Sequence, residues 1–184
     1  MKRILLSFIC IIFLFGCGQT DAAMNQALSL RDKLLHETVS LEARITADYG
    51  DVVYTFLLSC VSQPNGEMTF TVLAPESIKD IAGKIDEEGI LTFDQVALGL
   101  PLLSDGQLSP VSAPWVVLRA LRGGYIRSAG KEDGQILVDL QDSYGEDAVT
   151  VQLRLEEGLI PKQADLFWQE RRILTVEVEN FRIG

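Results

Sequence analysis

Few side chains in this sequence are of the types and spacings that do chemistry. His36 is the single histidine among 184 residues, and one histidine cannot build a multi-histidine metal site. Two pairs of adjacent carboxylates, Glu87/Glu88 and Glu156/Glu157, each precede a glycine. Adjacent turn residues diverge into solvent, so neither pair suits acid–base work. No Gly-x-Ser-x-Gly elbow, phosphate loop or EF-hand loop is present. We therefore expect neither catalysis nor a cofactor, and we interpret His36 as a surface residue near a helix end.

The cysteine with the most informative surroundings is Cys17. Lys2 and Arg3 give the chain a positively charged start, and the 12 residues from Ile4 to Phe15 are almost wholly apolar. This pattern is typical of a signal peptide, and the apolar run is shorter than the roughly 20 residues of a membrane-spanning helix. The segment Leu14-Phe15-Gly16-Cys17 resembles the lipobox of bacterial lipoproteins, with a leucine three positions before the cysteine and a small residue just before it.

That resemblance implies that cleavage removes residues 1–16 and that a diacylglycerol is attached to the Cys17 thiol. Two acyl chains anchor a protein stably, whereas a single chain binds only marginally. Residues 17–23 would then be a lipidated tether, and residues 24–184 a single domain at the extracytoplasmic face of the cell membrane. An ordinary secretory signal with an incidental cysteine is the alternative interpretation.

The net charge argues against a nucleic-acid partner, and the cysteine content argues against an internal disulfide. Removal of residues 1–16 leaves 168 residues, enough for one domain with a hydrophobic core. Loss of Lys2 and Arg3 takes the formal net charge from −10 to −12. Nucleic acids attract cations, so no nucleic-acid partner is expected. With Cys17 acylated, Cys60 has no partner for a disulfide, and we predict a buried, unreactive core thiol.

Hydrophobic periodicity predicts a helix and then strands in the first half of the domain. Residues 24–37 show helical spacing. The apolar stripe of that helix comprises Ala27, Leu28, Leu30, Leu34 and Leu35. Residues 39–48 alternate with period two, which predicts a strand with one wet face. Residues 52–61 are apolar on both sides, so we expect a strand that is covered on both faces or lines an apolar cavity. A turn at Pro64-Asn65-Gly66 leads into a third strand at 68–72, completing an antiparallel meander.

The middle of the chain changes pattern several times. We expect a helical turn at 75–78 and a hairpin formed by residues 81–85 and 90–93. The apolar segment 96–109 contains glycines and a proline and fits neither periodicity. A helix should begin after Ser112, its N-cap, and end at Gly123. Its expected faces are Trp115, Leu118 and Leu121 on one side, and Arg119 and Arg122 on the other.

The last third predicts strands only. Five segments rich in alternating apolar residues are separated by turn residues: 125–131, 135–141, 148–156, 159–168 and 172–183. About ten strands with two main helical segments predict an α+β fold. We expect a curved antiparallel sheet, an open half-barrel, wrapped over an N-terminal helix and a helical insert.

This order of elements resembles the LolA/LolB-like fold over most of residues 24–183. The turn and strand at 158–162, followed by residues 174–181, look like the end of such domains. The resemblance implies an open half-barrel whose concave apolar face holds helices and takes acyl chains, with residues 96–121 as its cover. The implied ligand-cavity residues are Tyr54, Phe56, Leu58, Trp115, Leu118 and Leu121.

Each of these assignments has a structural alternative. An apolar helix face against an apolar strand is also simply a core. Carriers of this family tend to use an arginine within the cavity, and Arg44, Arg119 and Arg122 are the candidates. A solvated surface position explains the same three arginines.

The sequence predicts a membrane-anchored lipoprotein that binds an acyl chain, a lipid or a lipoprotein in a concave apolar cavity. The alternative, of a different class, is a protein-interaction lipoprotein whose interior is filled by its own side chains and which binds or regulates an envelope or cell-wall enzyme. Some spore-germination lipoproteins resemble this fold and bind a cell-wall amidase. An open apolar cleft of roughly several hundred Å³ favours the first function, and a collapsed interior favours the second.

Overall fold

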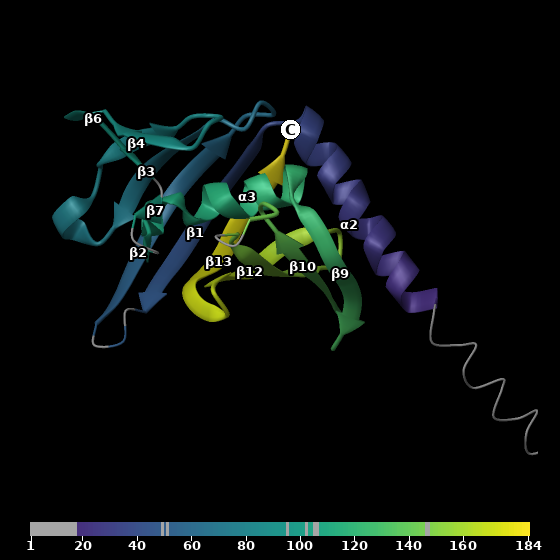
Figure 1. The fold of residues 1–184 in the computed structure, drawn as a ribbon. Coiled ribbons are helices and arrows are strands. Elements are labelled where there is room, and N and C mark those ends of the chain that lie inside the picture. The colour runs from purple at the N-terminus through teal and green to yellow at the C-terminus, as the bar shows by residue number, and fades with distance from the viewer. Residues whose placement is uncertain are drawn as a thin grey trace, which may run out of the picture.

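The computed structural model describes residues 18–48, 50, 52–94, 96–101, 103–104, 107–145 and 148–184. In these residues a single large sheet packs on two α-helices, α2 (Gly18–His36) and α3 (Ala113–Gly123) (Figure 1). Its strands are β1 (Val39–Asp48), β2 (Val53–Ser62), β3 (Met68–Ala74), β4 (Ala82–Ile85), β5 (Ile90–Phe93), β6 (Val96–Pro101), β9 (Tyr125–Glu132), β10 (Gln135–Gln141), β11 (Thr150–Glu156), β12 (Ile160–Trp168) and β13 (Arg171–Ile183). The remaining elements are the short pair β7 (Leu103–Ser104) and β8 (Gln107–Leu108) and the 3₁₀ turns η1 (Glu76–Ile78) and η2 (Pro110–Ser112).

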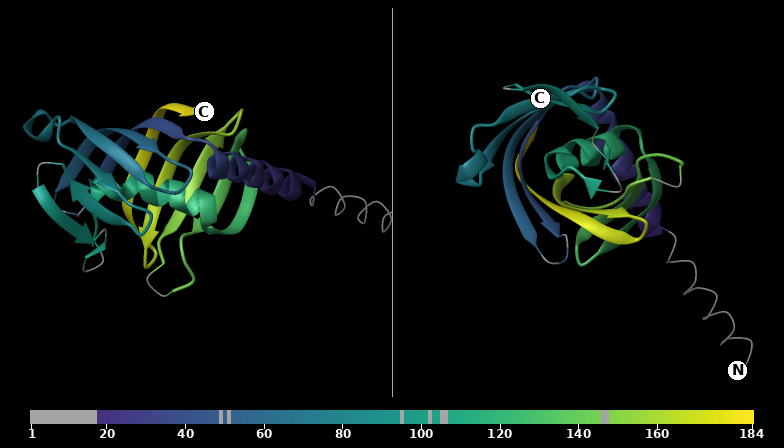
Figure 2. Two further views of the ribbon diagram at one scale, coloured as in Figure 1. Left: turned by 90° about the horizontal axis from the view of Figure 1, so that it is seen from above. Right: turned by 60° about the vertical axis from the view of Figure 1, so that its left-hand side comes forward.

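The eleven described strands of the large sheet follow the order β6-β5-β4-β3-β2-β1-β13-β12-β11-β10-β9, and every neighbouring pair is antiparallel. Strand β1 joins the two halves, because Ile45 pairs with Phe56 of β2 and with Val176 of β13. The sheet curves so that α3 lies within its bend (Figure 2). The predicted α+β class with an open, curved antiparallel sheet is confirmed.

Period-two patterning defines the concave face of this sheet. In β1 the buried side chains are Val39, Leu41, Ala43, Ile45 and Ala47, and the residues between them are half-buried. Since successive side chains of a strand point to opposite faces, this alternation places the apolar set towards the helices. The predicted turn at Asp133-Gly134 forms the β9–β10 hairpin with positive φ at both residues, 49° and 82°, as a type I′ connection requires.

Strand β2 is covered on one face only, and the expectation of cover on both faces is wrong. Leu58 and Cys60 point into the core and are 0% and 1% exposed. Val53 and Val61, on the opposite face, are 58% and 37% exposed. An antiparallel sheet tolerates water on one side, so apolar residues on that face need no second layer.

The N-terminal helix begins earlier than predicted and buries a different stripe. Helix α2 starts at Gly18 instead of Met24. Its buried side chains, at spacings of three and four residues, are Ala23, Ala27, Leu30 and Leu34. Leu28 and Leu35, which were expected in the stripe, are 44% and 45% exposed. The helix contacts β9 and α3, and this contact face is too narrow to include them.

Helix α3 is buried around most of its circumference, because it lies between the concave face of the sheet and α2. Trp115, Leu118 and Leu121 are buried as predicted, but Arg122 is buried as well. Ser112 precedes the helix, yet its hydroxyl caps no helical N–H group; it donates to the carbonyl oxygen of Ser109 at 2.6 Å. A helix in such a position has almost no wet face, which is why the predicted division into two faces fails for Arg122.

The segment that fitted no periodicity adds a strand to the sheet. Residues 96–101 form β6, the edge strand beside β5, and residues 103–104 and 107–108 form the β7–β8 pair. The predicted helical insert is therefore helical only from η2 onwards. Pro101 ends β6 at the sheet edge. Proline has no N–H group to donate, and an edge strand tolerates this because it has a neighbouring strand on one side only.

Candidate functional site

Four of the six predicted cavity residues meet in the packed interior. Leu58 of β2 is fully buried, and Leu118 and Leu121 of α3 are 3% and 2% exposed. Trp115 is 3% exposed, and its indole Nε1 donates to the carbonyl oxygen of Gly66 at 2.9 Å. These side chains fill the space between α3 and the concave face, where they pack against one another in one hydrophobic core.

The other two predicted cavity residues, Tyr54 and Phe56, lie where β2 leaves the core. Both share the face of the strand that carries Leu58, and their ring centroids are 6.4 Å apart. Phe56 is half-buried and Tyr54 is 49% exposed. Exposure therefore rises along β2 from Leu58 to Tyr54, and an aromatic pair ends the concave face here.

Arg44 is at the surface, as the solvated interpretation expected. Its neighbours Ala43 and Ile45 point into the core, so Arg44 lies on the outer face of β1. Its guanidinium is 3.9 Å from the Glu177 carboxylate and 3.6 Å from that of Glu179. Exposed pairs of this kind contribute about 0–1 kcal/mol. Arg44 is thus no arginine of the interior.

Among the described residues Arg122 is a buried arginine, which agrees with the interior position and not with the solvated one, the two interpretations that the sequence left open. It is 8% exposed; Nε donates to the Leu34 carbonyl at 2.9 Å, and Nη1 to the Ser62 hydroxyl at 2.7 Å. Nη2 is buried and has no acceptor. Burial lowers the pKa of the Arg122 guanidinium, since a low-dielectric site disfavours its charged form.

A second arginine makes the opposite connection between the two helices. Arg31 of α2 donates from Nε to the Leu121 carbonyl at 2.7 Å and from Nη2 to the Gly124 carbonyl at 2.6 Å. The last carbonyls of a helix have no partner within it, and they carry negative partial charge. Arg31 satisfies the end of α3, and Arg122 satisfies the end of α2. We call this arrangement the reciprocal arginine caps.

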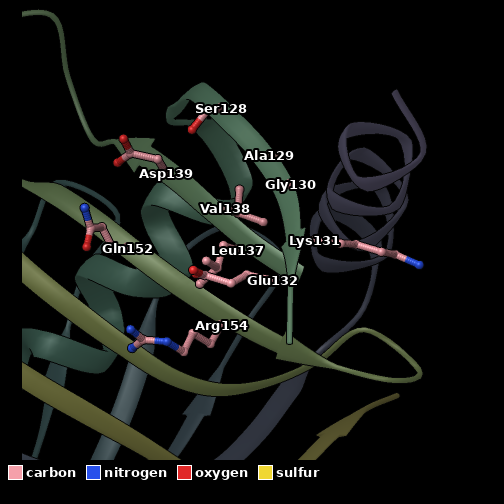
Figure 3. A pocket seen from close by; sticks show the side chains of 10 residues that line it. All are labelled: Ser128, Ala129, Gly130, Lys131, Glu132, Leu137, Val138, Asp139, Gln152 and Arg154. Atoms are coloured by element: carbon pink, nitrogen blue, oxygen red, sulfur yellow. The ribbon is translucent and has the colours of Figure 1, made fainter. Parts of the chain in front are cut away.

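One described cleft, of about 460 Å³, lies on the outer face of β9, β10 and β11. Figure 3 shows Asp139, Gln152 and Arg154 around it. Asp139 Oδ1 is buried without a hydrogen-bond partner, and Oδ2 is 4.0 Å from Arg127. Arg154 binds the buried Asp165 at 3.1 Å. This cleft is lined by both polar and apolar side chains and is on the face of the sheet opposite α3, so it is not the predicted acyl cavity of the concave face.

Two further clefts have other linings. One, of about 270 Å³, is on the outer face at β1, β2 and β13 and includes Glu42 and Asn180, whose side chains are hydrogen-bonded at 3.0 Å. The other, of about 240 Å³, lies between α3 and the β2–β3 and β4–β5 turns. We call it the arginine cleft and define it by Asn65, Glu87, Trp115, Arg119 and Arg122.

Sequence patterning could have indicated only part of the arginine cleft. Trp115, Arg119 and Arg122 are spaced four and three residues apart, so they share one side of the helix, and the predicted separation of Trp115 from the two arginines is wrong. Asn65 and Glu87 come from separate turns, and no local pattern connects them. None of the three clefts is lined by Tyr54, Phe56, Leu58, Leu118 or Leu121.

The remaining sequence-predicted residues give plain outcomes. Cys60 is buried, and burial raises the pKa of its thiol to about 12, as expected of an unreactive core cysteine. His36 is an exposed residue at the end of α2, where Nδ1 lies 2.8 Å from the Asp32 carbonyl oxygen. Across the described residues no three histidine, cysteine or acidic side chains group as metal ligands. Cys17 lies outside the described residues.

Neither α2 nor α3 combines the length and the apolar character that crossing a bilayer demands. The segment 1–16, expected to be a signal peptide, lies outside the described residues.

The chain has no match among protein-family models and none among curated proteins. Among solved structures it is similar to a DUF1329 family protein from Desulfovibrio piger, at 10% identity and a TM-score of 0.46, over 89% of this chain and 92% of that one. It is similar to a LolA superfamily protein from Nitrosomonas europaea, at 10% identity and a TM-score of 0.44, over 89% and 93%. A putative outer membrane lipoprotein-sorting protein domain from Vibrio parahaemolyticus gives 9% identity and a TM-score of 0.44, over 89% and 93%.

The solved structures that this chain is similar to thus include a LolA superfamily protein, the family that the sequence resembles. At about one identical residue in ten, the similarity does not extend to a ligand or a partner. Function has to be argued from the residues of this chain.

Proposed function

We propose that this chain is a non-catalytic binding lipoprotein, tethered at the extracytoplasmic face of a membrane, that engages an envelope or cell-wall protein through its surface. The observation that carries this choice is the packed interior. Leu58, Trp115, Leu118 and Leu121 are at most 3% exposed. A site for an acyl chain is a largely preformed apolar concavity, whereas these side chains already bury one another.

The tether is the second part of the proposal. The lipobox-like segment before Cys17 supports it, and α2 begins at the next residue, Gly18. A lipid on Cys17 would hold the start of α2 close to the membrane surface. The formal charge of −12 after cleavage gives the domain no electrostatic attraction to anionic headgroups, so the acyl chains would supply the binding.

Replacement of the lipidated residue tests the tether. In the native host, Cys17→Ser should move the protein from the membrane fraction to the soluble or secreted fraction, and it should abolish incorporation of labelled palmitate. Cys60→Ser is the matched control and should leave both unchanged. A Cys17→Ser protein that stays with the membrane would contradict lipid anchoring.

Acyl binding is the second candidate, and one observation favours it. Tyr54 and Phe56 present partly exposed rings on the concave-facing side of β2, at its open end. An acyl chain placed there would bury aromatic surface at about 25 cal/mol per Å². The site would lie at the rim of the half-barrel and not in its interior.

One comparison separates the two candidates. The chain from Gly18 to Gly184 contains every described residue; it would be purified under mild conditions, extracted with organic solvent and analysed by lipid mass spectrometry beside native mass spectrometry. We expect a clean protein mass, before and after incubation with membrane lipids. In parallel, crosslinking of the anchored protein in cells should give a specific protein adduct. A stoichiometric acyl species that Tyr54→Ser removes would overturn our choice and favour acyl binding.

A further inference from the structure

The arginine cleft combines three features that together describe a ligand site. It lies at the end of the molecule where α3 meets the turns after β2 and β4, and its volume is about 240 Å³. Helix α3 supplies Trp115, Arg119 and Arg122, and the two turns supply Asn65 and Glu87. The question is which chemistry these groups would bind.

The first feature is a pair of arginines that no described carboxylate pairs with, although Glu87 lines the same cleft. In the described part of the chain, neither Arg119 nor Arg122 makes an ion pair. Other arginines do, including Arg44 with Glu177 and Arg154 with Asp165. This chain has 26 acidic residues against 16 basic ones. Two guanidinium groups left unpaired in one cleft of so acidic a chain point to an anion from outside.

The second feature is a fixed aromatic platform under one of those cations. The Arg119 guanidinium carbon is 5.1 Å from the centre of the Trp115 ring. The ring itself is held by its hydrogen bond to the Gly66 carbonyl at 2.9 Å. Stacking on an aromatic face restricts the guanidinium and leaves its edge of N–H donors free for a planar acceptor. Arg119 is therefore exposed and oriented at the same time.

The third feature is an unused donor beside the cleft. Arg122 is 8% exposed and uses Nε and Nη1 on protein acceptors, while its buried Nη2 has none. A buried donor loses its hydrogen bonds to water, and without an acceptor in the protein no new hydrogen bond offsets that loss. An anion in the arginine cleft, which Arg122 lines, would bring negative charge close to this buried cation.

The charges in the cleft select the class of anion. Two arginines and Glu87 give a net charge of +1, and Glu87 is already placed, since its Oε1 accepts a hydrogen bond from Asn65 at 3.0 Å. One negative charge balances this site, whereas a phosphate dianion would overcompensate it. A carboxylate is planar and matches the guanidinium fork in two parallel hydrogen bonds. We propose that the arginine cleft binds the carboxylate of an acidic peptide segment in a partner protein, an inference that rests on the proposed protein-binding function.

The test follows the indole N–H signals of the ¹⁵N-labelled chain from Gly18, with Trp168→Phe used to assign Trp115. The probe is the blocked tripeptide acetyl-Ala-Glu-Ala-amide, which carries one carboxylate. The uncharged control is acetyl-Ala-Gln-Ala-amide. We expect the glutamate peptide to shift the Trp115 signal saturably and the glutamine peptide to bind at least tenfold more weakly. Equal effects of the two peptides would overturn the proposal.

Three variants make the result specific. Arg119→Gln should weaken binding about tenfold, because it removes the guanidinium that would pair with the carboxylate. No hydrogen bond from Arg119 to another described residue is lost, so the fold should be unaffected. Arg171→Gln removes the same charge from an exposed position outside the cleft and should change nothing. Glu87→Gln keeps the oxygen that accepts from Asn65 and removes the competing charge, so it should tighten binding several-fold, a gain that misfolding cannot produce. Unchanged affinity in both Arg119→Gln and Glu87→Gln would refute the assignment.

Titrations with small anions identify the source of the anion. If acetate binds as tightly as the glutamate peptide, the ligand is a free carboxylate and not a peptide segment. If inorganic phosphate binds more tightly than the glutamate peptide, the site does not select a carboxylate. A protein crosslink in cells that persists in Arg119→Gln would overturn this site and leave the proposed function standing. Peptide binding without any cellular partner would instead overturn the proposed function.

Discussion

At the scale of single residues, Arg31 and Arg122 explain how two helices are fixed to each other inside a half-barrel. Each donates to carbonyls at the C-terminal end of the other helix. The hydrogen bonds are charge-assisted, and the helix dipoles favour a cation at these ends. The contacts link residues about 90 positions apart in the chain, so they act between the first helix and the insert.

Truncation of Arg122 should therefore be costly. Arg122→Ala leaves the Leu34 carbonyl and the Ser62 hydroxyl without their donor and opens a cavity beside α3, and we expect a loss of about 2–4 kcal/mol in the free energy of unfolding. Arg119→Ala, three residues away, removes only an exposed cation–π contact, and its cost should stay below about 1 kcal/mol. Urea unfolding of both variants measures the difference. Equal losses would contradict the cap assignment.

Cys60 gives a second prediction at this scale. A thiol with a pKa of about 12 stays protonated throughout the neutral range, and it is also shielded from reagents. The native chain from Gly18 should thus react with a thiol reagent no faster at pH 9 than at pH 7, whereas an exposed cysteine, with a pKa near 8.5, would speed up markedly. Urea should restore full reactivity. Rapid labelling without urea would show that β2 opens locally.

The burial of apolar residues could be predicted from the sequence, whereas the burial of an arginine could not. Burial of Cys60, Leu118 and Leu121 follows from their own hydrophobicity. Burial of Arg122 does not, because the acceptors that permit it, Leu34 and Ser62, belong to other elements. A buried cation is allowed only by its partners, and a single sequence contains no signal that pairs them.

At the scale of elements, the link between α3 and β9 is set by a close approach of backbones. A Cβ on Gly124 would lie 2.5 Å from the Ala120 carbonyl oxygen and 2.7 Å from that of Gln141. Both neighbours are main-chain atoms of regular elements and cannot move aside cheaply. A Cβ on the preceding Gly123 would meet nothing within 4 Å. The two adjacent glycines thus have different reasons to be present.

This contrast gives a matched pair of variants. Gly124→Ala should lower the free energy of unfolding by more than about 2 kcal/mol, because overpacking forces the end of α3 away from β10. Gly123→Ala should be neutral or should stabilise by up to about 1 kcal/mol, since alanine in the last helical turn restricts the unfolded chain. Thermal unfolding of the two proteins under identical conditions checks both. A Gly124→Ala protein as stable as the parent would contradict the close approach.

The elements themselves were predictable where one face decides the pattern. Strand β1 and the turn at Asp133-Gly134 follow directly from alternation and turn chemistry. Strand β6 was not predicted, because Gly99 weakens a strand and Pro101 is tolerated chiefly at a sheet edge. Edge position is a property of the assembled sheet. The predicted buried stripe of α2 includes Leu28 and Leu35, because both fit helical spacing. In the structure both are exposed, because the face of α2 that contacts β9 and α3 is too narrow to cover them.

At the scale of the whole molecule, the half-barrel explains why the sequence predicts an apolar cavity where the described side chains are closely packed. Curvature of an antiparallel sheet creates a concave apolar face, and the sequence predicted that face and several of its residues. What occupies the concavity depends on side-chain volumes summed over the sheet, α3 and α2 together. Close packing of those volumes is not visible in any one segment. The described interior is filled by Trp115 and the leucines around it.

A filled interior makes a different prediction from an open one. Leu118→Ala removes a side chain that is 3% exposed at a helical position, so it should create a cavity and cost about 2–5 kcal/mol of the free energy of unfolding. Leu35→Ala, at a helical position that is 45% exposed, is the matched control and should cost well under that range. A residue lining a preformed acyl site would instead behave like the control, because its truncation would only widen an opening. Urea unfolding of the two variants decides between the cases. Near-equal stabilities of Leu118→Ala and Leu35→Ala would return the concave face to the role of a lipid cavity.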